Sequence, residues 1–256
     1  MIRKMSRIFL SWMLIFWISL FSPRIVFAQF GDFYDKFQDY VGGQVGDKYL
    51  KPFAKDLGGL IGGGSFHTGK SCGFPGFDIG IHLPLVSKPS EEDEILIKGL
   101  GGDKVYGLPW VQGEIGLPLL SFDAILRASY LGEAGGKLFG GGVKYSLLSG
   151  SIPLTPAISF SFLVNSLTHK KLNVLNYGFN GVASWGLPIV TPYAGIGFDN
   201  TTVKSKILSK ESEATASGWR FIGGINFKLF PLTYFHLGLG LVNNISSYEL
   251  GLGISF

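Results

Sequence analysis

The chain ends in Tyr248-Glu249-Leu250-Gly251-Leu252-Gly253-Ile254-Ser255-Phe256, a stretch that alternates strictly between two kinds of side chain. Large apolar residues occupy every second position, and Glu, Gly or Ser stands between them. A period of two residues is typical of a β-strand, because successive side chains of a strand point to opposite faces. The stretch therefore predicts a strand with one large apolar face and one small polar face.

The same alternation recurs from residue 76 onward. It predicts ten strands, near residues 76–86, 108–118, 121–131, 138–148, 156–165, 173–185, 191–201, 217–228, 232–242 and 246–256. Most of these runs exceed the usual five or six residues of a globular strand, but they match a tilted strand that crosses a bilayer. Charged residues make up only 16% of the chain, against about 25% in soluble domains. We therefore expect the large apolar faces to meet lipid.

The connections between the runs fall alternately into two groups. Those of the first group are short and hold Pro118, then Pro153 and Pro156, then Pro188, then Pro231. The second group includes two long polar segments, Ser87–Gly107 and Thr202–Ala216, and a tight turn at Asn243-Asn244. Outer-membrane barrels combine an even strand number with short periplasmic turns and longer external loops. This pattern predicts that the proline turns face the periplasm, together with the start of the first strand and the end of the last strand.

The predicted fold class is all-β, a transmembrane antiparallel up-and-down β-barrel of about ten strands with a short helical N-terminal segment. The alternative is a barrel of twelve strands, which would take two further strands from residues 45–70. Ten strands enclose too little space for an open aqueous channel, because barrel diameter grows with strand number.

On these features the chain resembles a bacterial outer-membrane β-barrel protein. Its last strand, from Tyr248 to the terminal Phe256, is similar to the signal that the barrel-assembly machinery of Gram-negative cells reads. The segment from Tyr49 to Thr68, followed by Gly76-Phe77-Asp78, is similar to the start of an uncharacterised, domain-of-unknown-function family of such barrels. The resemblance implies a location in the outer membrane, with its lipid and lipopolysaccharide and the assembly machinery as partners, and it implies no activity.

Residues 1–28 are typical of a signal peptide. Arg3, Lys4 and Arg7 precede an apolar run that ends at Phe21, and a cleavage motif follows at residues 26–28, so we expect the mature chain to begin at Gln29. Four of the 22 basic groups lie in this segment and none of the 18 acidic ones does, which leaves a balance of 18 to 18. The charge therefore gives no reason to expect a nucleic-acid partner.

Residues 29–75 differ from the predicted barrel, residues 76–256. Apolar side chains recur there every three or four residues, first from Phe30 to Val41 and again from Tyr49 to Leu60. This spacing predicts two short amphipathic helices. Their apolar faces need cover, either at the membrane interface or in the barrel lumen, where inward-facing glycines leave room. We favour a plug in the lumen.

Several charged residues fall on the predicted inner face. The lumen candidates are Glu114, Arg127, Lys144, Arg220, Lys228 and Glu249. Polar lumens are normal in such barrels, and opposite charges can pair there. The pattern therefore favours a structural network over a path that guides a substrate.

The sequence predicts neither an enzyme nor a cofactor. Gly64–Ser71 matches the phosphate-loop pattern, but it lacks the preceding strand and following helix that this chemistry needs. No spacing around His67 or His82 argues for a catalytic triad. Four histidines with the single Cys72 leave little for a metal site, so none is expected.

The expected function is a narrow, plugged transport barrel for a small or hydrophobic molecule. The alternatives are a structural or adhesive barrel without transport and, third, a lipid-modifying enzyme of the outer membrane.

Overall fold

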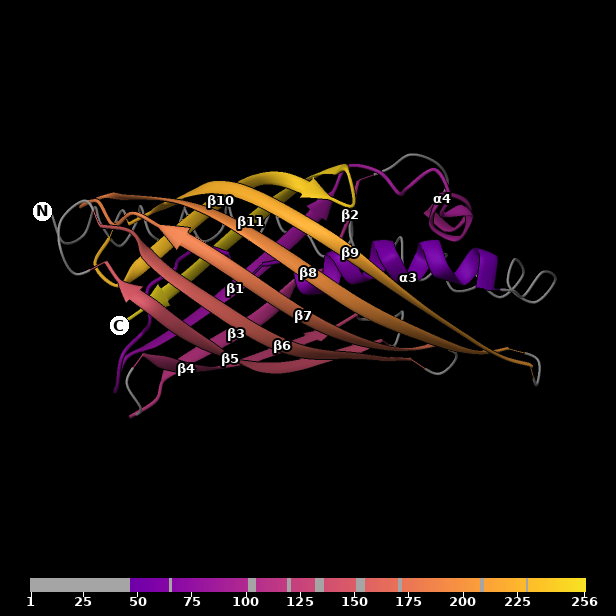
Figure 1. Ribbon diagram of the computed structural model, residues 1–256, viewed down its shortest axis with the longest axis horizontal. Helices are drawn as coiled ribbons and strands as arrows, with labels where there is room; N and C mark the ends of the chain where they lie inside the picture. Colours follow the sequence, from indigo (N-terminus) through magenta and orange to yellow (C-terminus); the bar gives the residue numbers. More distant parts are fainter. Residues whose placement is uncertain are drawn as a thin grey trace, which may run out of the picture.

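The computed structural model describes residues 47–64, 66–100, 105–118, 121–131, 136–150, 155–169, 172–207, 210–228 and 230–256. These residues form a β-barrel with a helix inside it (Figure 1). The strands are β1 (Phe77–Val86), β2 (Tyr106–Gly107), β3 (Trp110–Gly116), β4 (Phe122–Tyr130), β5 (Lys137–Ser149), β6 (Ala157–His169), β7 (Leu172–Ser184), β8 (Val190–Ile207), β9 (Lys210–Phe227), β10 (Thr233–Val242) and β11 (Ile245–Ser255). The helices are α3 (Asp47–Gly62) and α4 (Glu94–Leu100). The predicted signal peptide and the predicted helix near residues 30–41 lie outside the described residues.

Each strand from β3 to β10 pairs antiparallel with the next one along the chain, and β11 pairs with β1 from Ser255↔Asp78 to Ser247↔Val86, which closes the barrel. The short β2 and the following β3 both pair with β1, so they share one position in the wall. Pro109 separates them, because proline has no N–H to donate to the ladder. The prediction of a ten-stranded up-and-down barrel is confirmed. The twelve-strand alternative is wrong, because residues 47–62 form a helix.

Large apolar side chains cover the outside of the barrel. Ile81, Leu126 and Phe139 are each more than half exposed, whereas the residues beside them along the strands face inward and are buried. A closed antiparallel barrel leaves no open edge, and an apolar outer face suits hydrocarbon. The chain is an outer-membrane β-barrel protein. Neither helix in the described part of the chain combines the length and the apolar character of a membrane-spanning helix.

The predicted external loop Thr202–Ala216 is not a loop. Strands β8 and β9 run through it as an extended hairpin, in which Thr202 Oγ1 lies 2.9 Å from Thr215 Oγ1 and Lys204 Nζ lies 3.1 Å from Glu213 Oε2. The outward residues here are polar or charged, while the inward Val203 is fully buried. The inversion of the pattern indicates that this part of the hairpin stands beyond the bilayer, which explains why a search for apolar outer faces missed it.

Two connections show why the chain turns where it does. Asn243 and Asn244 join β10 to β11 and have φ of 53° and 72°, the left-handed pair that a two-residue hairpin requires and that asparagine tolerates. The predicted polar connection Ser87–Gly107 contains helix α4. Asp93 precedes this helix and accepts the backbone N–H of Leu96 at 2.9 Å, which caps the helix.

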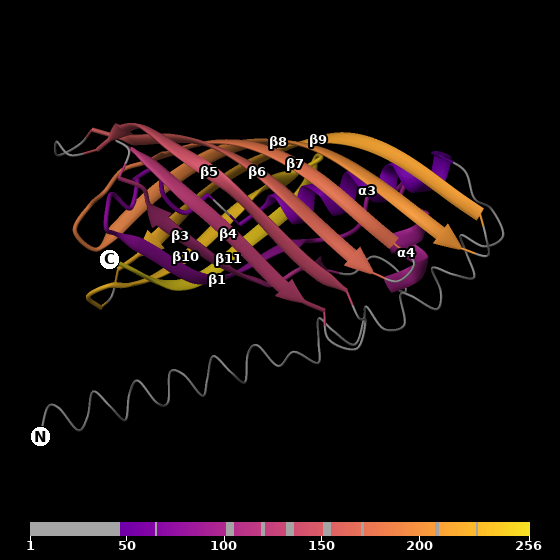
Figure 2. The same ribbon diagram turned by 90° about the horizontal axis from the view of Figure 1, so that it is seen from below.

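Helix α3 lies inside the barrel, along β8 and β9 and close to α4 (Figures 1 and 2). It begins at the end of the barrel where α4 lies, and the chain then continues toward the opposite end, where β1 starts and β11 ends. Its apolar side chains are buried against the inner wall, in what we term the apolar cup. The cup consists of Leu50, Phe53, Leu57 and Leu60 of the helix with Leu138, Leu167, Val174, Val203 and Val242 of the wall.

Candidate functional site

The lumen contains the segment from α3 to the start of β1, which we term the lumen segment, residues 47–64 and 66–76. Glycines on α3 let the helix lie directly against the wall. A methyl group added at Gly58 would lie 2.0 Å from Thr201 Oγ1, and one added at Gly62 would lie 2.0 Å from Asp199 Oδ1. Because neither distance is compatible with a side chain, the helix and the wall fit each other only with glycine at these positions.

Two buried arginines of the wall hold the C-terminal end of α3. Arg127 Nη1 donates to the carbonyl oxygen of Ile61, and Arg220 Nη1 donates to that of Gly59, both at 3.3 Å. The last carbonyl groups of a helix have no partner within the helix, and cations stabilise the negative end of its dipole. These two lumen candidates therefore bind the lumen segment.

Acidic side chains balance the two arginines, and we term the four residues Arg127, Asp199, Arg220 and Glu249 the arginine layer. Arg220 forms an ion pair with Asp199 and also donates to Asn180 Oδ1 at 2.7 Å. Glu249 accepts the backbone N–H of Gly64 at 2.8 Å. A buried charge needs such partners, because removal from water is costly otherwise.

A second cluster lies nearer the end of the barrel where β1 starts and β11 ends. The ammonium group of Lys144 contacts the carboxylates of Glu114 and Asp123. Asp123 also accepts the hydroxyl group of Ser71 at 2.7 Å and the backbone N–H of Cys72 at 3.1 Å. Wall charges thus hold the lumen segment at two levels.

Lys228, Tyr248 and Phe256 lie apart from these clusters. Lys228 was predicted to face the lumen; it follows the last residue of β9, Phe227, and its exposed side chain lines a cavity together with His67. Tyr248 and Phe256 point outward and are exposed. Their role as an assembly signal stays a prediction.

Two groups of described side chains offer donor atoms for a metal ion. Cys72, Glu114 and Asp123 form one, and His67, His82 and His236 form the other. In the first group the ammonium of Lys144 already contacts both carboxylates. Burial, followed by the nearby charge of Glu114, also raises the pKa of the Cys72 thiol, which disfavours the thiolate that a metal needs. For the second group, no ion pair with a lysine is present among the described residues.

The histidines show where sequence reasoning failed. His67 and His82 were treated separately because no spacing linked them, and His236 was not considered at all. The fold brings all three into one buried cluster. Beside it is a cavity of about 140 Å³, whose lining includes His67, Asp78, Tyr234 and Lys228.

The contact between α3 and the connection 87–105 is expected to depend on pH. Asp56 and Asp93 are buried together, and Asp56 also accepts the backbone N–H of Ser90 at 2.7 Å. Burial, followed by the charge of Asp56, raises the pKa of Asp93 well above its ordinary value, which favours the protonated form of Asp93. A raised carboxyl pKa stabilises the fold at low pH, and this contribution is lost as pH rises through the raised value.

Asp93→Asn should therefore remove this pH dependence, because an amide donates at every pH and asparagine still caps α4. Thermal unfolding in detergent between pH 4 and about 9 would measure the effect, with the exposed Glu92→Gln as the control. Identical pH profiles for the wild type and Asp93→Asn would contradict the raised pKa of Asp93.

Comparisons with known proteins add the following. No family model matches the chain, and no curated protein matches it, so the resemblance to an uncharacterised family stays a prediction. The chain is similar to the N-terminal β-barrel domain of OprF from Pseudomonas aeruginosa, with TM-score 0.36 and 10% identity over 71% of this chain and 97% of that chain. For the KdgM porin in complex with oligogalacturonate these values are 0.36, 10%, 70% and 99%. For Ail of Yersinia pestis they are 0.34, 9%, 71% and 97%. Similarity at this level carries no argument about function.

Proposed function

We propose that the chain is a narrow outer-membrane transporter for a small hydrophobic molecule and that the lumen segment closes it. One observation carries the proposal: a separate segment occupies the lumen, packed against the inward side chains of the wall. Gly58, Gly59 and Gly62 fit this segment closely to the wall, and every described contact that holds it there is noncovalent.

A purely structural barrel has no need for a filler of this kind. Barrels of about this size can fill their interior with inward-pointing side chains alone. Here Gly195 and Gly197 leave the space that Phe66 of the lumen segment occupies, since added methyl groups would lie 2.2 Å and 3.0 Å from its ring. A wall with missing side chains and a removable filler is what a gated passage requires.

The chemistry of the apolar cup supports a hydrophobic substrate. Displacement of α3 would expose Leu138, Leu167, Val174 and Val203 on the inner wall. Binding of an apolar molecule to such an inner surface is favourable by about 25 cal/mol for each Å² of apolar surface buried. Arg127 and Arg220 then serve as a latch on the helix, because their hydrogen bonds go to its backbone.

The test compares the intact protein with a variant that lacks residues 47–64, each inserted into planar bilayers. We expect current from the deletion variant alone, because the wall no longer contains a filler. Lys51→Gln, which changes an exposed residue of α3, is the control and should behave as the wild type. A hydrophobic molecule that copurifies with the intact protein, detected by mass spectrometry, would support the substrate class. No current from either form would contradict the transport proposal.

A second candidate, an adhesive barrel, has an observation of its own. Strands β8 and β9 have 18 residues each, and β9 pairs with β10 only from Arg220 to Phe227. On the side away from β8, residues 212–218 of β9 therefore pair with no strand among the described residues, and such a backbone edge can bind an extended peptide. Silent bilayers together with loss of partner or cell binding in a variant with a shortened hairpin would favour this candidate.

A further inference from the structure

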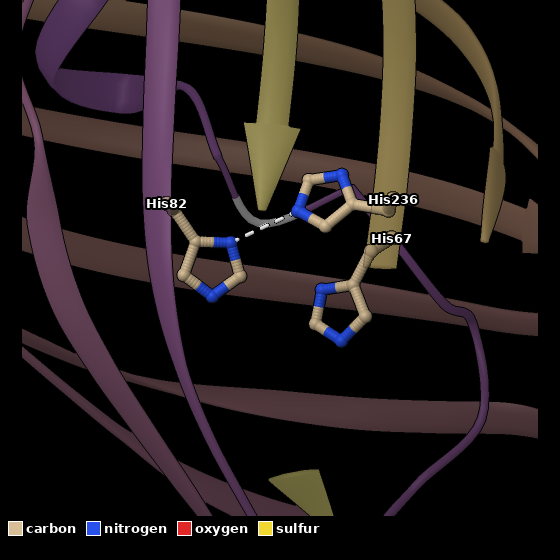
Figure 3. A group of neighbouring side chains, drawn as sticks. All are labelled: His67, His82 and His236. Atoms are coloured by element: carbon tan, nitrogen blue, oxygen red, sulfur yellow. Dashed lines mark hydrogen bonds between the residues drawn. The ribbon is translucent and has the colours of Figure 1, made fainter. Parts of the chain in front are cut away.

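We propose that His67, His82 and His236 bind a divalent transition-metal ion of the Zn²⁺ type. The three residues come from three different parts of the chain: the lumen segment, β1 and β10. All are at most 3% exposed, and one nitrogen from each lies within 4.8 Å of the others. Figure 3 shows the three rings turned toward the space between them.

The spacing of the rings fits a single ion. Their centroids form a nearly equilateral triangle with sides of 5.5, 5.3 and 5.3 Å. A tetrahedral zinc ion with Zn–N bonds of about 2.05 Å places its nitrogen ligands about 3.4 Å apart, and the ring centroids about 5.2 Å apart. His82 Nδ1 and His236 Nε2 are already 3.1 Å from each other.

Hydrogen bonding alone leaves the cluster unsatisfied. His67 Nδ1, His67 Nε2 and His82 Nε2 are buried without a hydrogen-bond partner, which is three of the six ring nitrogens. Buried polar atoms in this state are costly, and each needs an explanation. An ion at the centre would bind His67 Nδ1, His82 Nδ1 and His236 Nε2. It would thus provide the missing partner of His67 Nδ1.

The surroundings are those of ligating histidines. Such histidines usually direct the second ring nitrogen to a carboxylate or another polar group, which fixes the tautomer. His67 Nε2 lies 3.5 Å from Asp78 Oδ2, and Asp78 is itself held by the hydroxyl group of Tyr234 at 2.7 Å. His236 Nδ1 lies 3.3 Å from the hydroxyl oxygen of Tyr193.

Glycine makes room for the rings, and the adjoining cavity gives access to them. A methyl group at Gly251 would lie 2.0 Å from His236 Nε2, and one at Gly80 would lie 2.9 Å from His82 Nε2. The cavity of about 140 Å³ is lined by His67 and Asp78, so it adjoins the cluster at His67. Imidazole ligands select Zn²⁺, Cu²⁺ or Ni²⁺ over Mg²⁺ and Ca²⁺, which prefer oxygen.

The ion would join the lumen segment to two strands of the wall. This site does not rest on the transport proposal, since a structural barrel could hold the same ion. The test uses the full chain without a histidine tag, folded in detergent, stripped with a chelator and dialysed against Zn²⁺. We expect about one ion per chain, a loss of high-affinity binding in His67→Gln, and a 10- to 100-fold weaker affinity in Asp78→Asn.

His169→Gln changes the fourth histidine, which lies at the end of β6 away from the cluster, and it should bind as the wild type does. Heat-modifiable migration on gels verifies that each variant is folded. If His67→Gln does not fold, the visible spectrum of Co²⁺ in the wild type decides: intense tetrahedral bands without a thiolate charge-transfer band are expected. Zinc binding that persists in folded His67→Gln, a thiolate band that disappears in Cys72→Ser, or no bound ion in the wild type would each overturn the proposal.

Discussion

Arg220→Met should lower the free energy of unfolding in detergent by about 3–5 kcal/mol, the usual cost of leaving one partner of a buried ion pair alone. Arg220 and Asp199 are 2% and 1% exposed, and Arg220 carries three roles at once. It pairs with Asp199, donates to Asn180, and holds the carbonyl oxygen of Gly59 at the end of α3. The substitution keeps much of the side-chain volume and removes all three interactions.

The matched double variant Arg220→Met with Asp199→Leu separates charge from packing. Replacement of a whole buried ion pair by apolar residues is often neutral or even stabilising. We therefore expect the double variant to recover most of the loss, apart from the hydrogen bonds to Asn180 and Gly59. Urea titration followed by tryptophan fluorescence would measure both variants. A single variant as stable as the double one would show that the Asp199 carboxylate is not desolvated as the structure indicates.

The strands could be predicted closely wherever lipid selects the outward side chains. Residues 76–86 and 232–242 were expected as strands, and β1 and β10 begin within one residue of those bounds. The prediction of strand ends failed where the strands extend beyond the bilayer. In β8 and β9, outward residues such as Lys204 and Glu213 meet water, so the rule of apolar outer faces no longer identifies the strand.

The arginine layer could be predicted in part from the sequence. Arg127, Arg220 and Glu249 were named because they stand on the small face of predicted strands. Asp199 was missed, although it shares the alternation of Gly195 and Gly197 and so faces inward. Which charges pair could not be predicted, because pairing depends on strand register and on the helix between them.

The histidine cluster could not be predicted from the sequence, for a geometric reason. His82 and His236 stand on β1 and β10, which are separated in the wall by β11, and they meet across Gly251 because that position has no side chain. His67 reaches them only because the lumen segment passes through the barrel. Closure of the barrel and the path of a separate segment are not visible in local spacing.

The central claim is that α3 is a removable closure, and a disulfide that pins it to the wall gives the largest contrast. A Cβ built at Gly59 lies 3.7 Å from Val242 Cβ on β10, inside the 3.5–4.5 Å range of disulfides. Gly59→Cys with Val242→Cys, in a Cys72→Ser background, should therefore lock the helix when oxidised. The wall is a closed ladder of strands, so urea that detaches the helix should leave the barrel intact.

The decisive measurement is the single-channel current of this variant in urea, recorded on the same bilayer before and after a reductant is added. We expect silence while the disulfide holds and current after reduction, because the free helix then leaves the lumen. Each single-cysteine variant should conduct in urea under both conditions. Equal current from the double variant before and after reduction would show that α3 does not close the barrel.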